Sequence, residues 1–441
     1  MSAIQVSTPL WRQLQATAGV LRQVREGASA TTELAAVASD LRPAVQALLY
    51  LALRSLGRAE VIRQQLAPRK PPAGVDALLC LALALAWDEQ AAPYEIFTLV
   101  NQAVEAAKRT PALSPQANFM NACLRRFLRE RQALVALSDG NPLALWNHPL
   151  WWIDLIKKDH PQHWQAVLQA NNRPGPMSLR VNVRKIGVDA YLKLLRQAGI
   201  EAAPCGPSGV TLAQAMGVQA VPGFTQGLVS VQDAAAQRAA PLLLQGLASD
   251  QQLRLLDACA APGGKTAHLL ELTEANVTAL DIDALRCQRI NENLSRLGLQ
   301  ARVQAADALQ PKIWWDGELF DAILLDAPCT ASGIVRRHPD VRWLRRPSDI
   351  GQLAALQAKL LKTLWPLLKP GGRLLYCTCS VFREEGEQQV QAFLAHNTRA
   401  LLMPSPGHLL PGGGADGATL IHNQTDDHDG FYYALLEKRA A

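Results

Sequence analysis

The sequence predicts a multidomain fold with an all-helical bundle, a small α+β insert and a Rossmann-like α/β domain at the carboxyl end of the chain. Three observations support this prediction. Residues 1–138 carry apolar residues at helical spacing. From residue 253 onward, short apolar runs alternate with helical stretches, as in a parallel sheet covered by helices. Several of these runs end beside an aspartate, at the sheet edge where ligands bind.

Size, charge and cysteine usage narrow the class of protein only slightly. A chain of 441 residues is long enough for two or three domains, and its net charge of +6 leans mildly toward an anionic partner. The longest apolar run, residues 77–87, is too short to span a bilayer, and there is no secretory signal pattern, so we expect a cytoplasmic protein. The eight cysteines form no CxxC pair. We therefore expect thiolate chemistry rather than a metal site or a disulfide framework.

The amino-terminal region is expected to be a bundle of short helices. Its helical spacing is clear in Val45, Leu48, Leu49, Ala52, Leu53 and Leu56. Prolines at positions 71, 72 and 111 interrupt the pattern. Composition alone favours a solvated helix face over a phosphate-contacting surface for Arg125, Arg126, Arg129 and Arg131.

Residues 139–142 mark a boundary, after which a small α+β insert is predicted. Strands are expected at Met177–Val181 and Gly209–Leu212, with a helix at Val188–Gln197. Arg180 and Asn182 alternate with apolar neighbours, so they are assigned to the polar face of the first strand. The dense tryptophans before it are expected to fill a core rather than stack on bases: Trp146, Trp151, Trp152 and Trp164.

The α/β domain is expected to begin with a strand at residues 253–256, a turn of small residues, and a helix from Thr266 onward. Gly263 and Gly264 let the backbone approach a ligand closely. The sequence from Gly264 to Thr266 matches the end of a P-loop, but that motif requires a glycine where Cys259 stands. The nucleotide-hydrolase interpretation therefore fails.

Acidic residues follow the predicted strands in register. Strands at residues 277–280, 301–304 and 320–325 are followed by Asp281, Asp307 and Asp326, and Asp257 follows the first strand. Asp281 lies 18 residues after Gly263, close to the roughly 20 at which a doubly wound sheet places an acid on a ribose hydroxyl. One such acid is explained by a helix cap, but four in register favour a cofactor crevice.

The rest of the domain contains a helix at residues 349–365 and strands at 373–378 and 429–436, with a flexible loop at 412–417. Before it, residues 229–231 are predicted to be a strand that runs into an alanine-rich helix. Residues 326–346 are rich in arginine, with His338 and Trp343 interleaved, and favour a phosphate-binding loop. The arginines are Arg336, Arg337, Arg342, Arg345 and Arg346.

Three motifs, at residues 259–266, 326–329 and 378–380, resemble in order and spacing those of the S-adenosylmethionine-dependent RNA cytosine-C5 methyltransferases. The nearest likeness is the RsmB type, which acts on 16S ribosomal RNA. The resemblance implies a NusB-like helical RNA-binding domain over residues 1–138, whose closing helix carries the matching stretch at 118–126. It further implies a linker and a small RNA-facing α+β subdomain over residues 139–225, and the catalytic domain over residues 226–441.

The resemblance also implies S-adenosylmethionine as the cofactor. Residues 259–265 would wrap its methionine moiety, Asp281 would take the ribose hydroxyls, and Asp307 would face the adenine amine. The full predicted cofactor set is Ala258, Cys259, Ala260, Ala261, Pro262, Gly263, Gly264, Lys265, Asp281, Asp283, Asp307 and Asp326. The expected partner is 16S ribosomal RNA, free or partly assembled, and we expect a monomer.

The target chemistry explains why cysteine is needed. C5 of cytosine is a poor nucleophile, but addition of a thiolate at C6 converts the ring to an enamine whose C5 can attack a sulfonium methyl group. Cys329 and Cys379 both follow predicted strands, and their positions alone do not decide which one attacks. The resemblance assigns Cys379 as the nucleophile and Cys329 as the group that helps release the product. It places Lys265 near the reacting base, and Asp326 on the cytosine edge or the cofactor.

Two alternatives stay open. The first is a tRNA-directed enzyme of the same chemistry, against which the NusB-like segment argues by analogy. The second is an RNA-binding assembly factor with a vestigial transferase site. The intact cysteines, Lys265 and the strand-end acids speak against such decay.

Overall fold

The computed structural model describes residues 8–247, 252–412 and 427–440, and it divides into two compact units. The helical unit holds Met1–Arg173 and Val335–Arg345, and the sheet unit holds Pro174–Ile334 and Arg346–Ala441. Most of the loop expected at residues 412–417 lies outside the described residues. Among the described helices, none has both the length and the apolar composition that crossing a membrane requires.

The helical unit is a bundle, as the sequence predicts. Its α-helices are α1 (Leu10–Arg25), α2 (Ala30–Ala36), α3 (Arg42–Leu53), α4 (Leu56–Leu66), α5 (Ala73–Ala86), α6 (Ile96–Arg109), α7 (Ala117–Asp139), α8 (Pro142–Trp146), α9 (Leu150–Asp159), α10 (Trp164–Asn171) and α16 (Val341–Leu344). Every residue of α5 from Val75 to Ala86 is buried. The sequence of α5 is apolar on all sides, the pattern of a helix surrounded by others, and α1, α3, α4 and α6 pack around it.

The tryptophans of the helical unit fill its core only in part. Trp152 is fully buried, whereas Trp146, Trp151 and Trp164 are partly buried. Trp146 and Trp164 meet edge to face, with 4.8 Å between their ring centroids. Helices α8 to α10, which carry these residues, continue the compact helical unit beyond residue 138.

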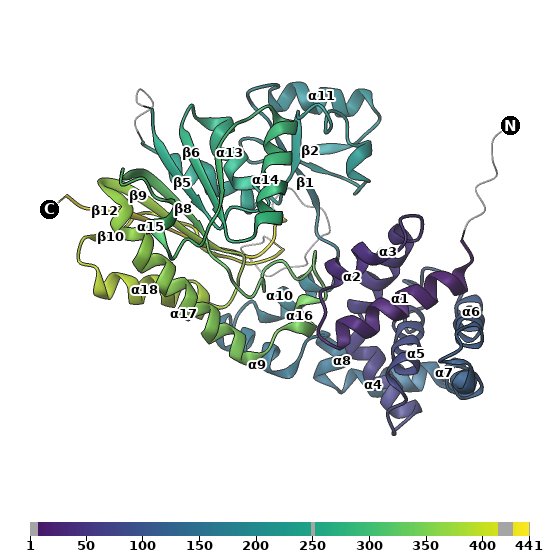
Figure 1. The fold of residues 1–441 in the computed structure, drawn as a ribbon. Helices are drawn as coiled ribbons and strands as arrows, with labels where there is room; N and C mark the ends of the chain where they lie inside the picture. Colours follow the sequence, from purple (N-terminus) through teal and green to yellow (C-terminus); the bar gives the residue numbers. More distant parts are fainter. Residues whose placement is uncertain (1–7, 248–251, 413–426, 441) are drawn as a thin grey trace. The chain divides into compact units, whose positions relative to one another are not determined.

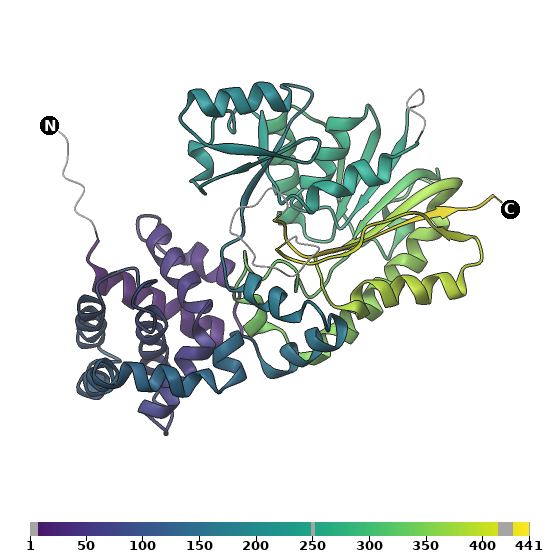
Figure 2. The same cartoon turned by 180° about the vertical axis from the view of Figure 1, so that it is seen from behind.

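The small α+β insert forms a four-stranded antiparallel sheet of order β2-β3-β1-β4. Strands β1 (Met177–Val181) and β3 (Gly209–Leu212) and helix α11 (Val188–Gln197) have the predicted bounds. Strand β2 (Ala202–Cys205) is missing from the sequence prediction, and β4 (Val229–Val231) pairs with β1. Figure 2 shows α11 lying across this four-stranded sheet. The strands of the sheet lie close to the eight-stranded sheet of the same unit.

The prediction of a polar face on β1 is wrong about the exposure of its side chains. Arg180 and Asn182 are both buried, with at most 1% of either residue exposed, so neither lies on an open surface of the insert. The amide of Asn182 donates a hydrogen bond to the carbonyl of Gly227. Alternation correctly separates these side chains from Leu179 and Val181, but the polar side of β1 is covered by other parts of the same unit.

The larger sheet has the order β10-β12-β9-β8-β5-β6-β7, with β11 paired to β12. Strands β5 to β9 are parallel, and β12 is antiparallel to β9. The strands are β5 (Arg254–Ala258), β6 (Asn276–Asp281), β7 (Arg302–Ala305), β8 (Phe320–Asp326), β9 (Leu368–Thr378), β10 (Ala400–Leu402), β11 (Gly407–Leu409) and β12 (Phe431–Lys438). The strands predicted from the apolar runs are therefore confirmed, with ends that differ by a few residues.

Helices cover both faces of this sheet (Figure 1). They are α12 (Ala239–Leu244), α13 (Gly264–Leu272), α14 (Ala284–Leu297), α15 (Pro311–Trp314), α17 (Pro347–Leu364) and α18 (Glu387–His396). Leu255 and Leu324 join the core under α12, α13 and α14, whereas Leu256 and Leu325 join the core under α17 and α18. Neighbouring residues of one strand thus serve opposite cores, as in a doubly wound sheet. The strand order reverses between β5 and β8, where such folds bind ligands.

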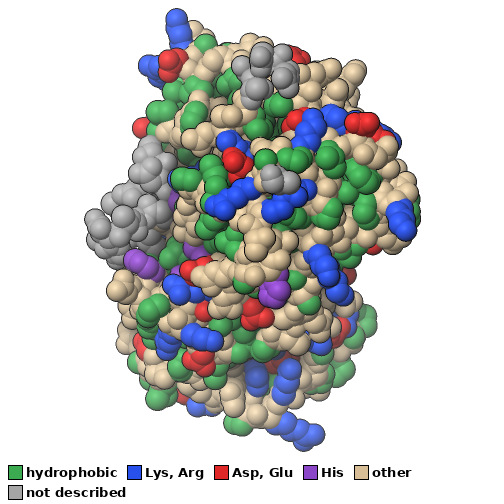
Figure 3. Space-filling view, turned by 90° about the vertical axis from the view of Figure 1, so that its left-hand side faces the viewer, with side chains coloured by type: hydrophobic (Ala, Val, Ile, Leu, Met, Phe, Trp, Pro, Cys, Tyr) green, Lys and Arg blue, Asp and Glu red, His purple; other side chains and the backbone are tan. Residues whose placement is uncertain are grey.

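Charges of both signs are mixed over the face of the molecule in Figure 3. Lysine and arginine side chains are scattered among acidic and hydrophobic ones there. This distribution agrees with a net charge of only +6 over 441 residues. A site for an anionic partner therefore depends on particular residues rather than on the overall charge.

Candidate active site

A cavity of about 120 Å³ lies at the carboxyl ends of β5, β6, β7 and β8. Its walls come from the end of β6, the loops after these strands, and helices α14 and α17. The lining residues are Cys259, Leu280, Asp281, Ile282, Arg286, Ala306, Asp307, Ala308, Leu309, Pro328, Leu356 and Leu360. Two predicted cofactor acids, Asp281 and Asp307, thus face the same space as the backbone turn at Cys259.

The turn after β5 contains two residues with left-handed backbone conformations. Cys259 and Gly263 have φ angles of 61° and 92°, in the left-handed region. A side chain at position 263 would lie 3.0 Å from Ile290, so glycine also allows α14 to approach. The amide of Ala261 donates to Asp281, at 3.1 Å, which ties the turn to the end of β6.

The predicted cofactor acids have different surroundings. Asp281 is almost fully buried and also accepts a hydrogen bond from the amide of Asp283. The Asp283 carboxylate caps α14 by accepting from the amides of Leu285 and Arg286, and it does not line the cavity. Asp257, a strand-end acid outside the predicted cofactor set, is fully buried, accepts a hydrogen bond from the Thr266 hydroxyl at 2.5 Å, and also lies outside the cavity lining. Burial raises the pKa of Asp257 to about 7, although the Thr266 hydrogen bond works against the shift.

The remaining predicted cofactor residues surround the turn without lining this cavity. Ala258, Ala260 and Ala261 are buried, Pro262 is exposed, and Gly264 begins α13. Lys265 and Asp326 meet each other instead, with 2.5 Å between the Lys265 ammonium and the Asp326 carboxylate.

Lys265 and Asp326 form a charged pair at the carboxyl ends of β5 and β8. Burial alone would lower the pKa of Lys265, but the Asp326 carboxylate and nearby thiols outweigh it and raise the pKa above its usual value. Lys265 therefore stays cationic. Its ammonium lies 5.3 Å from the centre of the Phe431 ring, at the start of β12.

The sulfur atoms of Cys329 and Cys379 are 3.4 Å apart, although the two residues are 50 positions apart in the chain. Both side chains are partly exposed. The hydrogen bond to Cys379, followed by burial, raises the pKa of Cys329 well above its usual value. Cys377 is fully buried, and burial and the Asp326 carboxylate raise its pKa in the same direction. Cys329 and Cys377 are therefore held as thiols beside Cys379.

A buried glutamate that the sequence analysis missed connects the two cysteine loops. Glu385 accepts hydrogen bonds from the amide of Thr330 at 2.8 Å, from the hydroxyl of Ser380 at 2.7 Å, and from the hydroxyl of Thr330. Thr330 and Ser380 directly follow Cys329 and Cys379. The Gln357 amide donates to the same carboxylate at 3.2 Å. Within a short charged stretch, sequence alone gives no signal that separates this buried acid from its exposed neighbour Glu384.

Arg180 connects the small sheet to the predicted cofactor turn. Its guanidinium makes two hydrogen bonds to the Glu271 carboxylate, at 2.7 and 2.8 Å, and donates to the carbonyl of Gly264 at 2.8 Å. It also donates to the Gln232 side chain. The arginine predicted to lie on a polar face therefore supports the first residue of α13.

The prediction of a phosphate-binding loop is wrong for Arg336 and Arg342, two of its five arginines. Arg342 is fully buried and donates to the carbonyls of Asn147 and Asn171, so it fixes the fold of the helical unit. Arg336 is only 2% exposed, and both residues lie in Val335–Arg345, which belongs to that unit. Arg346, in contrast, is exposed.

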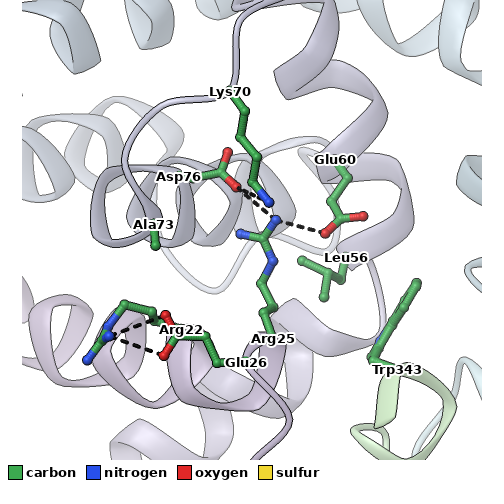
Figure 4. Close-up of a pocket in the computed structure, with 9 residues that line it drawn as sticks. All are labelled: Arg22, Arg25, Glu26, Leu56, Glu60, Lys70, Ala73, Asp76 and Trp343. Atoms are coloured by element: carbon green, nitrogen blue, oxygen red, sulfur yellow. Dashed lines mark hydrogen bonds and ion pairs between the residues drawn. The ribbon is translucent and has the colours of Figure 1, made fainter. Parts of the chain in front are cut away.

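A hollow of the helical unit is balanced in charge (Figure 4). Arg25 reaches Glu60 at 3.0 Å and Asp76 at 2.8 Å, and Lys70 lies 3.9 Å from Asp76. Arg22 pairs with Glu26 at 3.2 Å. Three cations face three carboxylates there, so the hollow does not offer the excess positive charge that a phosphate site needs.

The fold and this site together define the class of protein. A doubly wound parallel sheet with an antiparallel strand beside β9, and a glycine turn after β5, form an α/β methyltransferase domain. A family model described as 16S rRNA methyltransferase RsmB/F matches residues 244–437. Another, described as the ferredoxin-like domain of RsmF/B-like methyltransferases, matches residues 148–219.

Similar proteins identify the family. The ribosomal RNA small subunit methyltransferase B of Vibrio vulnificus (strain YJ016) is 42% identical over 96% of this chain and 99% of its own. The chain therefore belongs to the ribosomal RNA small subunit methyltransferase B family. A solved methyltransferase homologue protein from Pyrococcus horikoshii is 28% identical and has a TM-score of 0.56 over 67% of this chain and 97% of its own. The structure of PH0851 shares the fold, with a TM-score of 0.76 and 24% identity over 98% of this chain and 100% of that one.

Replacing Arg180 with methionine is expected to lower the free energy of unfolding by about 3–5 kcal/mol, because it leaves the buried Glu271 carboxylate without its partner. The double variant Arg180→Met with Glu271→Leu should recover part of this loss, measured by urea denaturation as a double-mutant cycle. Arg184→Met is the matched control, since its partner Glu274 is 91% exposed and such a surface pair is worth at most about 1 kcal/mol. Equal losses for Arg180→Met and Arg184→Met would contradict this account.

Replacing Glu385 with glutamine is expected to lower kcat about a hundredfold, because misplacing reacting groups by about 1 Å has an effect of that size. The side-chain amide of the new glutamine would point its N–H group at the Thr330 amide, the Ser380 hydroxyl and the Gln357 amide. These groups donate hydrogen bonds to the wild-type carboxylate, so the new N–H group has no acceptor there. Steady-state methylation assays should show the loss in kcat, with the KM for the methyl donor within about twofold of wild type. Glu384→Gln, at the exposed adjacent position, should behave as wild type. A Glu385→Gln enzyme with normal kcat would show that the carboxylate does not position the cysteines.

Proposed function

We propose that this protein transfers a methyl group from S-adenosylmethionine to C5 of a cytosine in 16S ribosomal RNA, through a covalent bond between Cys379 and C6 of the base. The observation that carries the proposal is the 3.4 Å separation of the Cys329 and Cys379 sulfur atoms. It is supported by the Lys265–Asp326 pair at the ends of β5 and β8 and by the small-subunit ribosomal RNA named for the family's members.

The cavity beside Cys259 has the chemistry that S-adenosylmethionine needs. Ile282, Ala308 and Leu309 offer apolar contacts for a flat ring. Asp281 and Asp307 offer carboxylate acceptors for hydroxyl and amine groups. When bound, S-adenosylmethionine supplies the electrophilic methyl group that C5 attacks.

Cys379 supplies the attacking sulfur. As a thiolate it forms the bond to C6, and the electron pair of the C5–C6 double bond becomes available at C5. After methylation a base removes the C5 proton, the double bond forms again, and the bond between C6 and the Cys379 sulfur breaks. Cys329, held as a thiol 3.4 Å away, stabilises the departing thiolate by donating a hydrogen bond to it.

The charged pair at the strand ends orients the base. Asp326 accepts a hydrogen bond from the cytosine edge or from the cofactor, and Lys265 lies beside the reacting ring. The ion pair between them keeps Lys265 cationic and holds the Asp326 side chain in place as a hydrogen-bond acceptor. The positive charge of Lys265 also favours a thiolate at this edge of the sheet.

The other parts of the chain are proposed to bind RNA. The division is a NusB-like RNA-binding domain over residues 1–138, an RNA-facing subdomain over 139–225, and the catalytic domain over 226–441. Support comes from the helical bundle around α5 and from the family models that match residues 148–219 and 244–437. The burial of Arg180 and Asn182 means that any RNA contact of the insert is made by other residues.

A covalent trap tests the roles of the two cysteines. With S-adenosylmethionine and 16S ribosomal RNA, Cys329→Ala should accumulate a denaturant-stable protein–RNA adduct, because release is impaired. Cys379→Ala should form none, and Cys123→Ala, in the helical unit, should turn over as wild type. Gel electrophoresis under denaturing conditions reads the adduct. The reverse pattern would exchange the two roles, and neither adduct nor methyl transfer in any variant would favour an RNA-binding assembly factor.

The state of the substrate provides a second test. A paired target base has to be unstacked before it reaches a cysteine, at a cost of a few kcal/mol. Deproteinised 16S ribosomal RNA should therefore be methylated faster than assembled small subunits, measured by transfer of labelled methyl groups. Transfer RNA is the control for specificity. Equal or faster reaction on intact subunits would contradict the expected preference, and faster reaction on transfer RNA would favour a tRNA-directed enzyme.

A further inference from the structure

The sheet unit contains a second, larger cavity of about 630 Å³ that shares no lining residue with the cofactor cavity. It lies between the turn joining β2 to β3, helices α12 and α13, and the chain around positions 406 and 428. Its lining residues are Cys205, Gly206, Pro207, Ser208, Ala234, Gln237, Arg238, Pro241, Leu242, Gln245, His268, Pro406 and His428. Neither the sequence motifs nor the proposed reaction uses this space.

His268 is the polar group of this cavity that most needs a ligand. It is only 2% exposed, and neither of its ring nitrogens has a hydrogen-bond partner among the described residues. Burial, and then the positive charge of Arg180, lower the pKa of His268 to about 2, so the ring is neutral and carries one donor and one acceptor. Because buried polar groups in folded proteins are usually paired, a ligand edge with a complementary acceptor and donor would complete the site.

The rest of the lining favours an anion with a flat apolar part. Pro207, Pro241, Leu242 and Pro406 provide apolar walls, and Arg238 is exposed at the site. No carboxylate occurs among the described residues that line the cavity. This distinguishes it from the hollow of Figure 4, where acids balance the cations. A heteroaromatic base with a phosphate combines these features, since the base can pack on apolar walls, the edge can bond an imidazole, and arginine binds phosphate.

The cavity adjoins the proposed active site through shared elements. His268 follows Lys265 by three residues on α13, about one helical turn. The segment that carries Ala234 is joined to the chain before β12 by a hydrogen bond from the Asp429 amide to Asp233, at 3.1 Å. Farther along, the Tyr433 hydroxyl donates to the Ala235 carbonyl at 2.8 Å. The same strand begins with Phe431, the ring beside the Lys265 ammonium.

We propose that this cavity binds a nucleotide of the RNA strand that flanks the methylated cytosine. Its base lies between the apolar walls with its edge on His268, and its phosphate faces Arg238. The inference rests on the proposed function, and it adds a contact that selects an unpaired neighbour of the target base. Holding that neighbour out of its stack also helps to present the target to Cys379.

Two variants and a control test the proposal in the full-length protein. His268→Leu removes the donor and the acceptor, and Arg238→Glu reverses the exposed charge without changing the buried surroundings. Loss of one base contact is worth about tenfold in affinity, so each variant should raise the KM for deproteinised 16S ribosomal RNA about tenfold. The KM for S-adenosylmethionine should stay within about twofold of wild type. Arg399→Glu is the control, because this exposed residue precedes β10, which pairs with the far end of β12.

Photocrosslinking gives an independent readout. 4-Thiouridine-substituted 16S ribosomal RNA, bound to wild type and irradiated, should give crosslinked peptides that contain the lining residues around Pro241 or Pro207, located by mass spectrometry. Arg238→Glu should reduce these crosslinks, and Arg399→Glu should not. Because Arg238 is exposed, its variant decides the question even where His268→Leu fails to fold.

The outcomes separate this inference from the proposed function. An active wild-type enzyme whose Arg238→Glu variant keeps the same KM, with no crosslink at the lining residues, overturns the nucleotide site and leaves the methyltransferase proposal intact. A wild-type protein that methylates no RNA overturns both. A raised KM together with crosslinks at the cavity supports the site.

Discussion

The arrangement of the two cysteines depends on one buried carboxylate. Cys329 and Cys379 follow different strands, and parallel pairing of β8 with β9 brings their loops to one edge without setting the distance between the sulfur atoms. Glu385 contributes to that distance by accepting hydrogen bonds from Thr330 and from Ser380, the residues after the two cysteines, while a hydrogen bond from the Gly333 amide to the Cys379 carbonyl, at 2.9 Å, joins the loops directly. Both loops are thereby attached to a single group that is itself fully buried.

Electrostatics then distinguishes the three thiols of this region. Cys329 and Cys377 both have raised pKa values, the first chiefly through its hydrogen bond with Cys379 and the second chiefly through burial. Asp326 contributes to the shift of Cys377 and also pairs with Lys265. The result is a cation and two protonated thiols around Cys379. This arrangement suits a reaction in which one sulfur attacks and another assists its departure.

Arginine has a structural role in several places where its sequence context suggests contact with RNA. Arg180 supports the Gly264 carbonyl and neutralises Glu271, and Arg342 bonds backbone carbonyls in the helical unit. In both cases the guanidinium is buried with several acceptors around it. A search for the RNA surface should therefore begin with exposed arginines such as Arg238 and Arg346.

The sequence by itself predicted strands β5 to β9 of the parallel sheet, strand β12, and the loops after β5 and β8 that carry the candidate site residues. Apolar runs and periodicity depend on local burial, so the sequence places β1, β3 and α11 to the residue. Strand β2, with the sequence Ala-Ala-Pro-Cys, has too little β-forming character to be recognised. Only the tertiary structure decided which strand-end acids face the cavity, which arginines are buried, and that Glu385 and His268 are buried polar groups. The physical reason is that burial and hydrogen-bond partners come from residues far apart in the chain, such as Arg180 with Glu271 and Thr330 with Glu385. No local pattern records those partners.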